Sequence, residues 1–354
     1  MHVSIRKTAV LWSFGSLFLA SCLWAQGAPP RQAGPARPQQ MVDPRLAGAQ
    51  ALPPTTPQAP PWWPQSDAHQ KYVSDVLNFW EQSSSNITHY QCKFSRWEYD
   101  PVWGPKPDPK TGKRPAVRIS YGEIKYAKPD KGLFKVNKVT HYTAAANPAD
   151  EAQFLPKEGE TGEHWVCDGK SIFQFDHENK KLIEHQLPPD MQGKAIVDGP
   201  LPFLFGAEAR KIQERYWVGV FTPKDVKGQY WLEAWPKYRE DAKNYKKVEI
   251  IIDEKDFLPM ALQIYDHNGS VNDPSSTVLT FEEREVNFDL RRLGILDPLG
   301  WTKREFIEPN KPFSYKKEVI RFDAASGQQP QQQATLPRGT QATRSLPQIP
   351  LKQK

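Results

Sequence analysis

The stretch Glu163–Leu187 reads EHWVCDGKSIFQFDHENKKLIEHQL and decides the fold. It holds three short runs rich in aromatic and branched residues, separated by two polar segments. The first segment, Asp168–Lys170, is typical of a tight hairpin turn, because glycine tolerates a positive φ and an aspartate side chain bonds its own turn backbone. The stretch therefore predicts a three-strand antiparallel meander with strands at His164–Cys167, Ser171–Asp176 and Leu182–Leu187.

Segments of the same kind continue the meander on both sides. The Pro/Gly turn Lys128–Gly132 and the dipeptide Asn268-Gly269 each join two of them, and both are typical hairpin signals. Ten or so antiparallel strands with two helices predict a mainly β (α+β) fold, a strongly curved antiparallel sheet or open half-barrel. The further predicted strands are His89–Asp100, Val117–Ala127, Gly132–His141, Tyr216–Thr222, Gln229–Trp235, Lys247–Asp253, Pro259–Asp266 and Ser276–Asn287.

Two helices and two long loops complete the expected body. Apolar residues at three- and four-residue spacing predict a helix over Ala68–Ser83, capped by Asp67. A second, short helix is expected over Phe203–Glu214, where prolines precede an apolar run. Pro101–Pro115 and Tyr142–Gly162 are predicted loops. In the strand at His89–Asp100, alternation places Tyr90, Cys92, Phe94 and Trp97 on one side. Phe288–Asp323 is expected to mix a short helix with an extended segment that closes a sheet edge.

Both ends of the chain have the composition of disordered segments. Gln26–Pro64 contains eleven prolines in 39 positions, and Ala324–Lys354 is rich in Gln and Pro and has no acidic residue. Neither tract has enough apolar surface to offset the entropy of ordering. The predicted organisation is a signal peptide at 1–25, a disordered Pro/Gln-rich linker at 26–66, one β-rich domain at 67–323, and a disordered basic tail at 324–354.

The N-terminus has the pattern of an export signal. Arg6 and Lys7 precede Thr8–Ala25, which is uncharged and mostly apolar. Two interpretations stay open: cleavage near Ala25, or lipidation of Cys22 within the lipobox-like Leu19–Cys22. We expect an exported protein of the periplasm or cell envelope, with a lipid anchor at that cysteine as the open alternative.

The charge distribution argues against a nucleic-acid-binding body. The leader contributes two positive charges, the linker a net two and the tail four, so these three segments together carry +8. Because the formal net charge of the whole chain is +6, the folded part carries −2. The folded part therefore has no excess of positive charge that would favour binding to nucleic acid. The basic ends are compatible with weak contact to membrane or cell wall, and the body is expected to be a monomer.

No pattern for catalysis, metal binding or a cofactor occurs. The chain lacks a nucleophile elbow, a phosphate loop, a dinucleotide fingerprint and a paired-histidine zinc helix. His164, His177 and His185 are close in sequence, but their spacing across turns does not establish a zinc site. Cys92 and Cys167 are expected to be small buried residues, with a disulfide as the alternative. We predict a protein that is not an enzyme.

The aromatic content points to an apolar cavity. The chain has 12 Trp, 12 Tyr and 17 Phe, and a large curved sheet encloses more apolar surface than a few helices fill. This predicts a site for an acyl chain or another hydrophobic ligand. The candidate cavity residues are Phe134, Trp165, Phe173, Phe203, Leu204, Phe205 and Trp231.

The order of motifs resembles the LolA/LolB-like fold of outer-membrane lipoprotein carriers. The similarity covers roughly Tyr72–Asn287. The segments WVCDGKSIFQFD, DGPLPFLFG and NYKKVEIIID also resemble an uncharacterised exported planctomycete domain family. The landmarks that carry the carrier resemblance are Gly122–Pro129, Leu133–Val136, Val166–Phe173, Pro202–Gly206, Tyr230–Lys237, Val248–Asp253 and Ala261–Asp266.

The carrier resemblance implies that the concave face binds a lipid acyl chain or a lipoprotein under a helical lid. It also implies that Lys128, the basic residue before Pro129, is associated with that lid. The Pro101–Pro115 insertion, the long Tyr142–Gly162 loop and both ends depart from the family pattern. The alternative is an envelope scaffold or sensor that uses the same fold to contact a protein or an anionic polymer.

Overall fold

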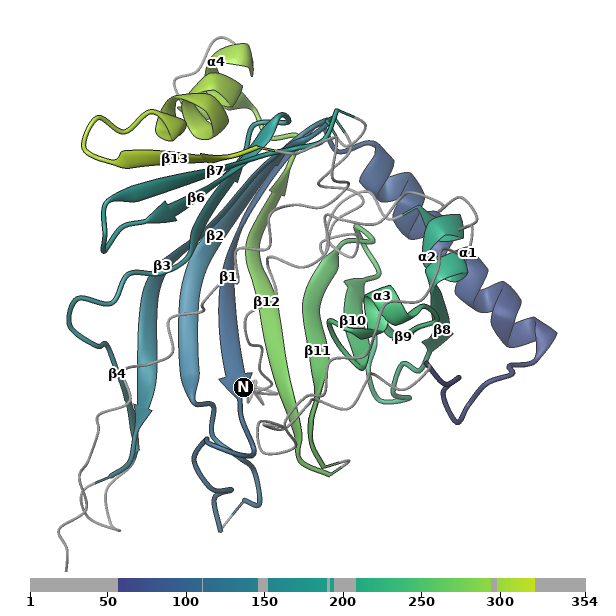
Figure 1. Ribbon diagram of the computed structural model, residues 1–354. Helices are drawn as coiled ribbons and strands as arrows, with labels where there is room; N and C mark the ends of the chain where they lie inside the picture. The colour runs from purple at the N-terminus through teal and green to yellow at the C-terminus, as the bar shows by residue number, and fades with distance from the viewer. Residues whose placement is uncertain are drawn as a thin grey trace, which may run out of the picture.

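The computed structural model describes residues 57–109, 111–145, 152–189, 192–193, 208–270, 272–293 and 298–321. These residues build one large curved sheet with a few helices around it (Figure 1). The thirteen strands are β1 (His89–Tyr99), β2 (Arg118–Ala127), β3 (Lys131–Thr143), β4 (Gln153–Leu155), β5 (His164–Cys167), β6 (Ser171–Asp176), β7 (Lys181–Gln186), β8 (Tyr216–Val220), β9 (Gln229–Pro236), β10 (Lys247–Asp253), β11 (Pro259–Gly269), β12 (Pro274–Val286) and β13 (Lys316–Ile320).

The strand order confirms the predicted mainly β fold. Across the sheet it runs β13-β7-β6-β5-β3-β2-β1-β12-β11-β10-β9-β8, with β4 paired to β3. In the described part of the chain β13 and β8 lie at opposite ends of this order, so the sheet is unclosed. Neighbouring strands are antiparallel except β13, which is parallel to β7. The pairing of β1 with β12 joins the two halves of the chain and places Phe94 opposite Phe281.

The central meander forms as the sequence predicts. Strands β5 and β6 have the predicted bounds, and β7 begins one residue earlier. Gly169 has a φ of 91°, and the carboxylate of Asp168 accepts hydrogen bonds from the backbone N–H groups of Lys170 and Ser171. In the second turn Asp176 accepts from the N–H of Asn179. Side chains of the turns themselves therefore set both hairpins.

Helix α1 (Asp67–Ser85) packs on one face of the sheet, which we call the inner face; the opposite face is the outer face. The helix begins after Ser66, whose hydroxyl accepts from the N–H of His69, so the cap lies one residue before the predicted Asp67. Its buried stripe includes Leu77 and Trp80, as the periodicity predicts. Helix α2 (Ala209–Arg215) packs beside α1 and β8. The preceding residues 203–207 of the second predicted helix lie outside the described residues.

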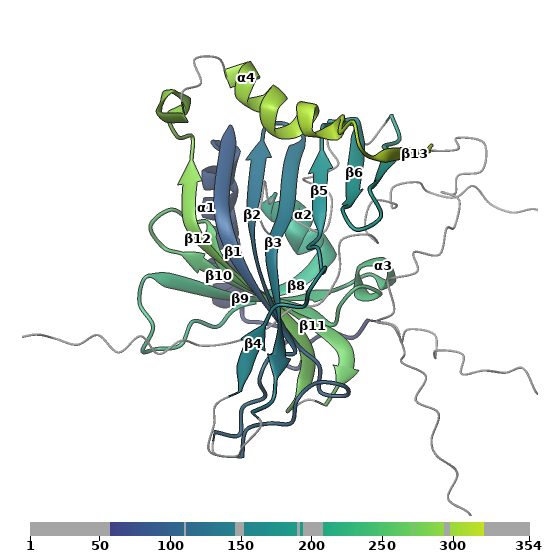
Figure 2. The same ribbon diagram turned by 90° about the vertical axis from the view of Figure 1, so that its left-hand side faces the viewer.

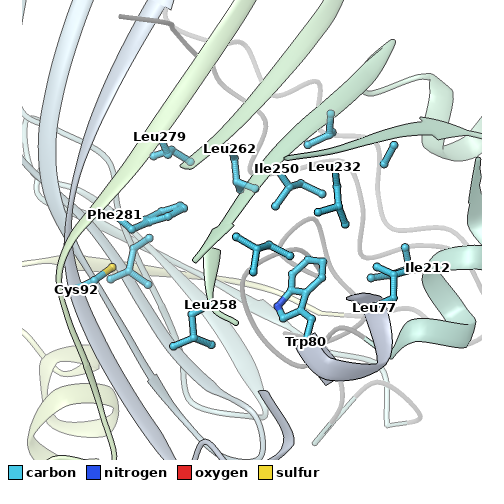
Figure 3. Packing of buried hydrophobic residues seen from close by; sticks show 14 of the residues in the cluster. Leu77, Trp80, Cys92, Ile212, Leu232, Ile250, Leu258, Leu262, Leu279 and Phe281 are labelled. Atoms are coloured by element: carbon cyan, nitrogen blue, oxygen red, sulfur yellow. The ribbon is translucent and has the colours of Figure 1, made fainter. Parts of the chain in front are cut away.

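Side chains of both halves of the sheet meet α1 on the inner face, and we call this cluster the inner core. Directly paired residues point to the same face of a sheet, so the pairing of Leu232, Ile250, Leu262 and Leu279 aligns them in one row. Burying each such side chain stabilises the fold by about 1.5–3 kcal/mol. Figure 3 shows Leu77, Trp80, Cys92, Ile212, Leu232, Ile250, Leu258, Leu262, Leu279 and Phe281 of the inner core.

A second cluster, the outer core, covers the outer face of β5–β7. It is formed with the C-terminal segment of η2 (Leu290–Leu293), α4 (Pro298–Thr302), η3 (Lys303–Ile307) and η4 (Glu308–Asn310). In Figure 2 this segment runs in front of the strands, whereas α1 and α2 lie behind them. The outer core consists of Ala127, Leu133, Val166, Phe173, Phe175, Leu182, Phe288, Leu290, Trp301 and Phe306.

Several elements differ from the sequence-based expectations. Strand β4 lies within the predicted loop Tyr142–Gly162, and the short helix α3 (Arg239–Ala242) was not predicted. The extended segment expected near the C-terminus is β13. Residues before the predicted boundary at Asp67 also contact the sheet, because the indole N–H of Trp62 donates to Glu233 in β9 at 2.6 Å. A contact between residues so far apart in sequence leaves no trace in local composition.

Candidate functional site on the inner face

Apolar side chains extend the inner core across β1, β2, β3 and β5. Phe134 is paired with Ile124 on one side and with Trp165 on the other, so the three share the inner face. The ring of Phe134 stacks on that of Phe94 with centroids 4.7 Å apart. Phe134 is 4% exposed and Trp165 is 7% exposed. These residues form a continuous row of buried apolar side chains on the part of the sheet away from β8.

The structure brings two of the predicted cavity residues together and separates two others from them. Phe134 and Trp165 lie side by side on the inner face. Phe173 is paired with Val166, one position out of phase with Trp165, and it is buried in the outer core. Trp231 lies on the outer face of β9, where its indole N–H donates to Gln229 at 2.9 Å. The remaining candidates, Phe203, Leu204 and Phe205, lie outside the described residues.

The two other residues singled out from the sequence are placed differently. Lys128 follows β2, and its ammonium group donates to the backbone carbonyl of Ser85 at 3.0 Å, at the C-terminal end of α1. Its backbone N–H donates to the carbonyl of Thr88. Lys128 thus ties the β2–β3 turn to the helix that covers the inner core, and a cation at a helix C-terminus is electrostatically favourable. Cys22 lies outside the described residues.

A buried charged cluster, which the sequence analysis missed, forms one end of the inner face. The guanidinium of Arg96 donates to both carboxylate oxygens of Glu163, at 3.1 and 3.2 Å. Glu98 in turn accepts two hydrogen bonds from Arg118, at 2.8 and 2.6 Å. Burial lowers the pKa of Arg118, but Glu98 more than offsets this, so the net shift is upward. The four side chains form two bidentate pairs, so each guanidinium faces a carboxylate in a partly buried place.

The signal for this cluster was the alternation of β1 itself. Residues Tyr90, Cys92 and Phe94 point inward, and two further steps of two residues reach Arg96 and Glu98. The prediction that Trp97 shares this side is wrong, because Trp97 is out of phase with Phe94 and is paired with Val278 and Ile119. Trp97 was included because it is large and apolar, although it lies three residues after Phe94 and the side chains of a strand alternate with a period of two.

The inner face holds no reactive nucleophile among its described cysteine and tyrosine side chains. Cys92 and Cys167 are both buried, as expected, and neither forms a disulfide within the described part of the chain. Burial raises the pKa of the Cys92 thiol to about 12 and that of the Tyr126 hydroxyl to about 12. Both groups therefore stay protonated near neutral pH, and a protonated thiol is a poor nucleophile.

A second group of titratable residues lies on the outer face, where the C-terminal segment meets β5 and β6. His164 Nδ1 is 3.0 Å from His177 Nε2, and His177 Nδ1 is 2.7 Å from the hydroxyl of Tyr315. The His164 ring also stacks on Phe175 at 4.2 Å. Burial, together with His177 and Lys135, lowers the pKa of His164 to about 3. His185, the third histidine noted in the sequence, points to the inner face with Ile172.

The described ranges contain neither a candidate metal cluster nor a candidate membrane-spanning helix. Within them, no three or more His, Cys, Asp or Glu side chains are grouped so that they could hold a metal ion. None of the helices in those ranges is both long and apolar enough to cross a membrane.

Comparison with known proteins supplies similar folds only. No family model matches the sequence, and no curated protein matches it. An uncharacterized conserved protein of Thermus thermophilus aligns with 71% of this chain and 99% of its own at 9% identity, with a TM-score of 0.36. The lipoprotein LppX of Mycobacterium tuberculosis aligns with 63% of this chain and 100% of its own at 10% identity and a TM-score of 0.31.

A LolA superfamily protein of Nitrosomonas europaea is also similar. It aligns with 62% of this chain and 96% of its own, at 11% identity and a TM-score of 0.28. Because identities and structural agreement are both low, no function is carried over from these proteins.

Proposed function

We propose that this protein is an exported, non-enzymatic binding or carrier protein of the cell envelope that takes up an acyl chain on the inner face of its sheet. The observation that supports the proposal is the row of buried apolar side chains around Phe134 and Trp165. It continues the inner core beyond the strands on which α1 and α2 pack. An elongated apolar ligand gains free energy by leaving water for such apolar side chains.

The charged cluster makes one end of this row of apolar side chains polar. Phe94, Arg96 and Glu98 follow one another on the inner face of the same strand, so the row of apolar side chains ends at paired guanidinium and carboxylate groups. A bound chain would run along the apolar part, and only a polar group would be tolerated at the charged end. This arrangement suits an amphiphile better than a pure hydrocarbon.

Uptake of a fluorescent fatty acid by matched variants tests the proposal. Phe134 and Phe173 are 4% and 5% exposed, but they lie on opposite faces of the sheet. Truncation of either to alanine should destabilise the protein by about 3–5 kcal/mol, and urea unfolding would verify that the two costs are comparable. We expect the wild type to bind the probe saturably, Phe134→Ala to weaken binding about tenfold, and Phe173→Ala to leave it unchanged.

Two results would contradict the proposal. Equal loss of binding in both variants would show a general effect of destabilisation. Absence of probe binding by the folded wild type would remove the acyl-chain function and favour the alternative role, a scaffold or sensor that contacts a protein.

A further inference from the structure

Aromatic side chains gather on the outer face of β8 and β9, where neither core lies. In β9 the inward residues Leu232 and Ala234 are buried, whereas the outward residues Trp231 and Trp235 stay partly exposed. Trp217 of β8 is directly paired with Trp235 and is also partly exposed, so it lies on the same face. The solvated face of an antiparallel sheet ordinarily carries polar residues, so three tryptophans at such positions call for an explanation.

A fourth tryptophan joins them from the segment that precedes α1. Trp62 lies against Phe221, with ring centroids 5.2 Å apart, and its indole N–H donates to Glu233 at 2.6 Å. The indole N–H of Trp235 donates to the same carboxylate oxygen at 2.6 Å. Glu233 lies midway between Trp231 and Trp235 on one face of β9, and these two residues are about 13 Å apart along the strand. The four indoles therefore form one patch, which we call the tryptophan platform: Trp62, Trp217, Trp231 and Trp235.

Three indoles of the platform are held in place by hydrogen bonds at their edges. Two of them donate to Glu233, and the indole of Trp231 donates to Gln229 at 2.9 Å. Glu233 also accepts from the ammonium group of Lys247 at 2.7 Å. Burial alone would raise the pKa of Glu233, but these hydrogen bonds lower it overall, so the carboxylate that orients the rings is ionised at neutral pH. Because the three N–H groups are already used, these indoles offer a ligand their partly exposed faces.

The charges beside the platform balance one another. Lys247 donates to Glu249 at 2.6 Å as well as to Glu233. The ammonium group of Lys246 lies 5.9 Å from the ring centroid of Trp235. These two carboxylates and two ammonium groups sum to zero charge, so neither an anionic ligand nor the phosphates of a nucleic acid are favoured. They do supply hydrogen-bond donors and acceptors at the edge of the rings.

We propose that the tryptophan platform is a binding site for a neutral, extended polysaccharide. One face of a pyranose ring carries C–H groups that pack on the face of an indole, and its hydroxyl groups project at the edge and form hydrogen bonds with charged side chains. The platform offers both kinds of contact, and its length of about 13 Å along β9 admits more than one sugar unit. Indoles that are fixed in advance lose little conformational entropy on binding. The site lies on the opposite face of the sheet from the proposed acyl-chain site and does not depend on it.

Calorimetric titration of the full-length protein with neutral hexasaccharides provides the first test. The probes are cellohexaose, mannohexaose, xylohexaose and isomaltohexaose, which differ in the shape of the chain but carry no charge. We expect at least one of them to bind saturably, with the same affinity at low and high salt, because contacts to a neutral ligand are not screened. If the folded wild type binds none of these probes, the proposal is overturned.

Matched tryptophan variants give the second test. Trp231→Ala removes one ring of the platform, and Trp103→Ala is the control, because Trp103 is 88% exposed in the loop between β1 and β2. We expect Trp231→Ala to weaken binding of the hexasaccharide about tenfold, the loss of one ring contact, and Trp103→Ala to bind as the wild type does. Wild-type affinity in Trp231→Ala, or an equal loss in both variants, would refute the platform as the binding site.

A conservative variant separates the face of the ring from the fold of the strand. Trp231→Phe keeps an aromatic face but lacks the N–H that bonds Gln229. We expect Trp231→Phe to bind within about threefold of the wild type, because the ring face makes the contact. Thermal unfolding verifies that this variant is folded. If folded Trp231→Phe binds as poorly as Trp231→Ala, stacking on the ring does not carry the affinity and the proposal is wrong.

Discussion

The inner and outer cores bury the two faces of one sheet but draw on very different parts of the chain. The inner core joins residues from Val73 to Phe281 and includes strands of both halves. The outer core joins the β2–β7 region to the C-terminal segment. Each contains a fully buried tryptophan, Trp80 or Trp301, whose indole N–H has no partner. The difference indicates that the inner core holds the whole fold together, whereas the outer core fastens one segment.

Truncation of the two tryptophans should give the largest effects. Trp80→Ala is expected to cost about 3–5 kcal/mol of global stability, because the cavity lies between α1 and both halves of the sheet. Trp301→Ala should instead loosen the C-terminal segment before the rest of the protein unfolds. Urea unfolding combined with hydrogen exchange separates the two behaviours. Simultaneous, global loss of protection in Trp301→Ala would contradict the distinction.

Breaking the buried charge pair should be the next largest effect, and it concerns the inner face alone. Glu163→Gln removes the bidentate carboxylate partner of the buried Arg96 guanidinium and leaves it only Glu98, 3.3 Å from Nε, which should cost about 2–4 kcal/mol. The exposed pair of Lys93 and Glu283 provides the control, since Glu283→Gln should cost less than about 1 kcal/mol. Equal costs in thermal unfolding would show that Arg96 is not effectively desolvated.

Acid should weaken the outer core specifically. The pKa of His164 is lowered from the ordinary 6.5 to about 3, so between these values the unfolded chain binds more protons than the folded one. Stability from this group is therefore complete above about pH 6.5 and is lost as the pH falls toward 3. Because the imidazole is partly exposed, we expect a contribution of about 1–3 kcal/mol.

The matched variant for this effect is His164→Phe, which keeps an aromatic ring against Phe175 and cannot titrate. Its stability should change less between pH 7 and pH 4 than that of the wild type, as measured by urea unfolding at each pH. A pH dependence as steep as that of the wild type would exclude His164 as the source.

The smallest effect is expected at the solvent-facing side of α1. Lys71 and Asp75 form an exposed i, i+4 ion pair at 2.6 Å. Lys71→Ala should change the free energy of unfolding by less than about 0.5 kcal/mol, and high salt should remove the difference. A larger loss in chemical denaturation would show that α1 depends on its outer charges as well as on its buried stripe.

Local signals predicted the elements of this fold well. The Asp-Gly turn at Asp168 and the alternation of the flanking runs were sufficient for β5, β6 and β7, because a hairpin depends on residues close in sequence. Strand β13 was harder, since a parallel edge strand carries no hairpin signal and pairs with β7 more than a hundred residues away. The contact of Trp62 with Glu233 is of the same long-range kind.

The same local reasoning identified only some residues of the candidate site. Phe134 and Trp165 could be chosen from the sequence because they are large apolar residues in predicted strands. Alternation shows which residues of one strand share a face. It does not show which face α1 will cover, and β6 buries Phe173 on the outer side beneath the C-terminal segment. Two-sided burial removes the contrast between apolar and polar faces on which the pattern depends.

By itself, the sequence determined the mainly β class, the order and bounds of most strands, and the apolar stripe of α1. These follow from turn chemistry and from periods of two and 3.6 residues, which act over a few positions. Only the tertiary structure decided which face is the inner one and that Glu163 would meet Arg96, 67 positions away. Such contacts depend on the pairing of distant strands and on which helix covers each face, and neither is encoded in any short stretch of the chain.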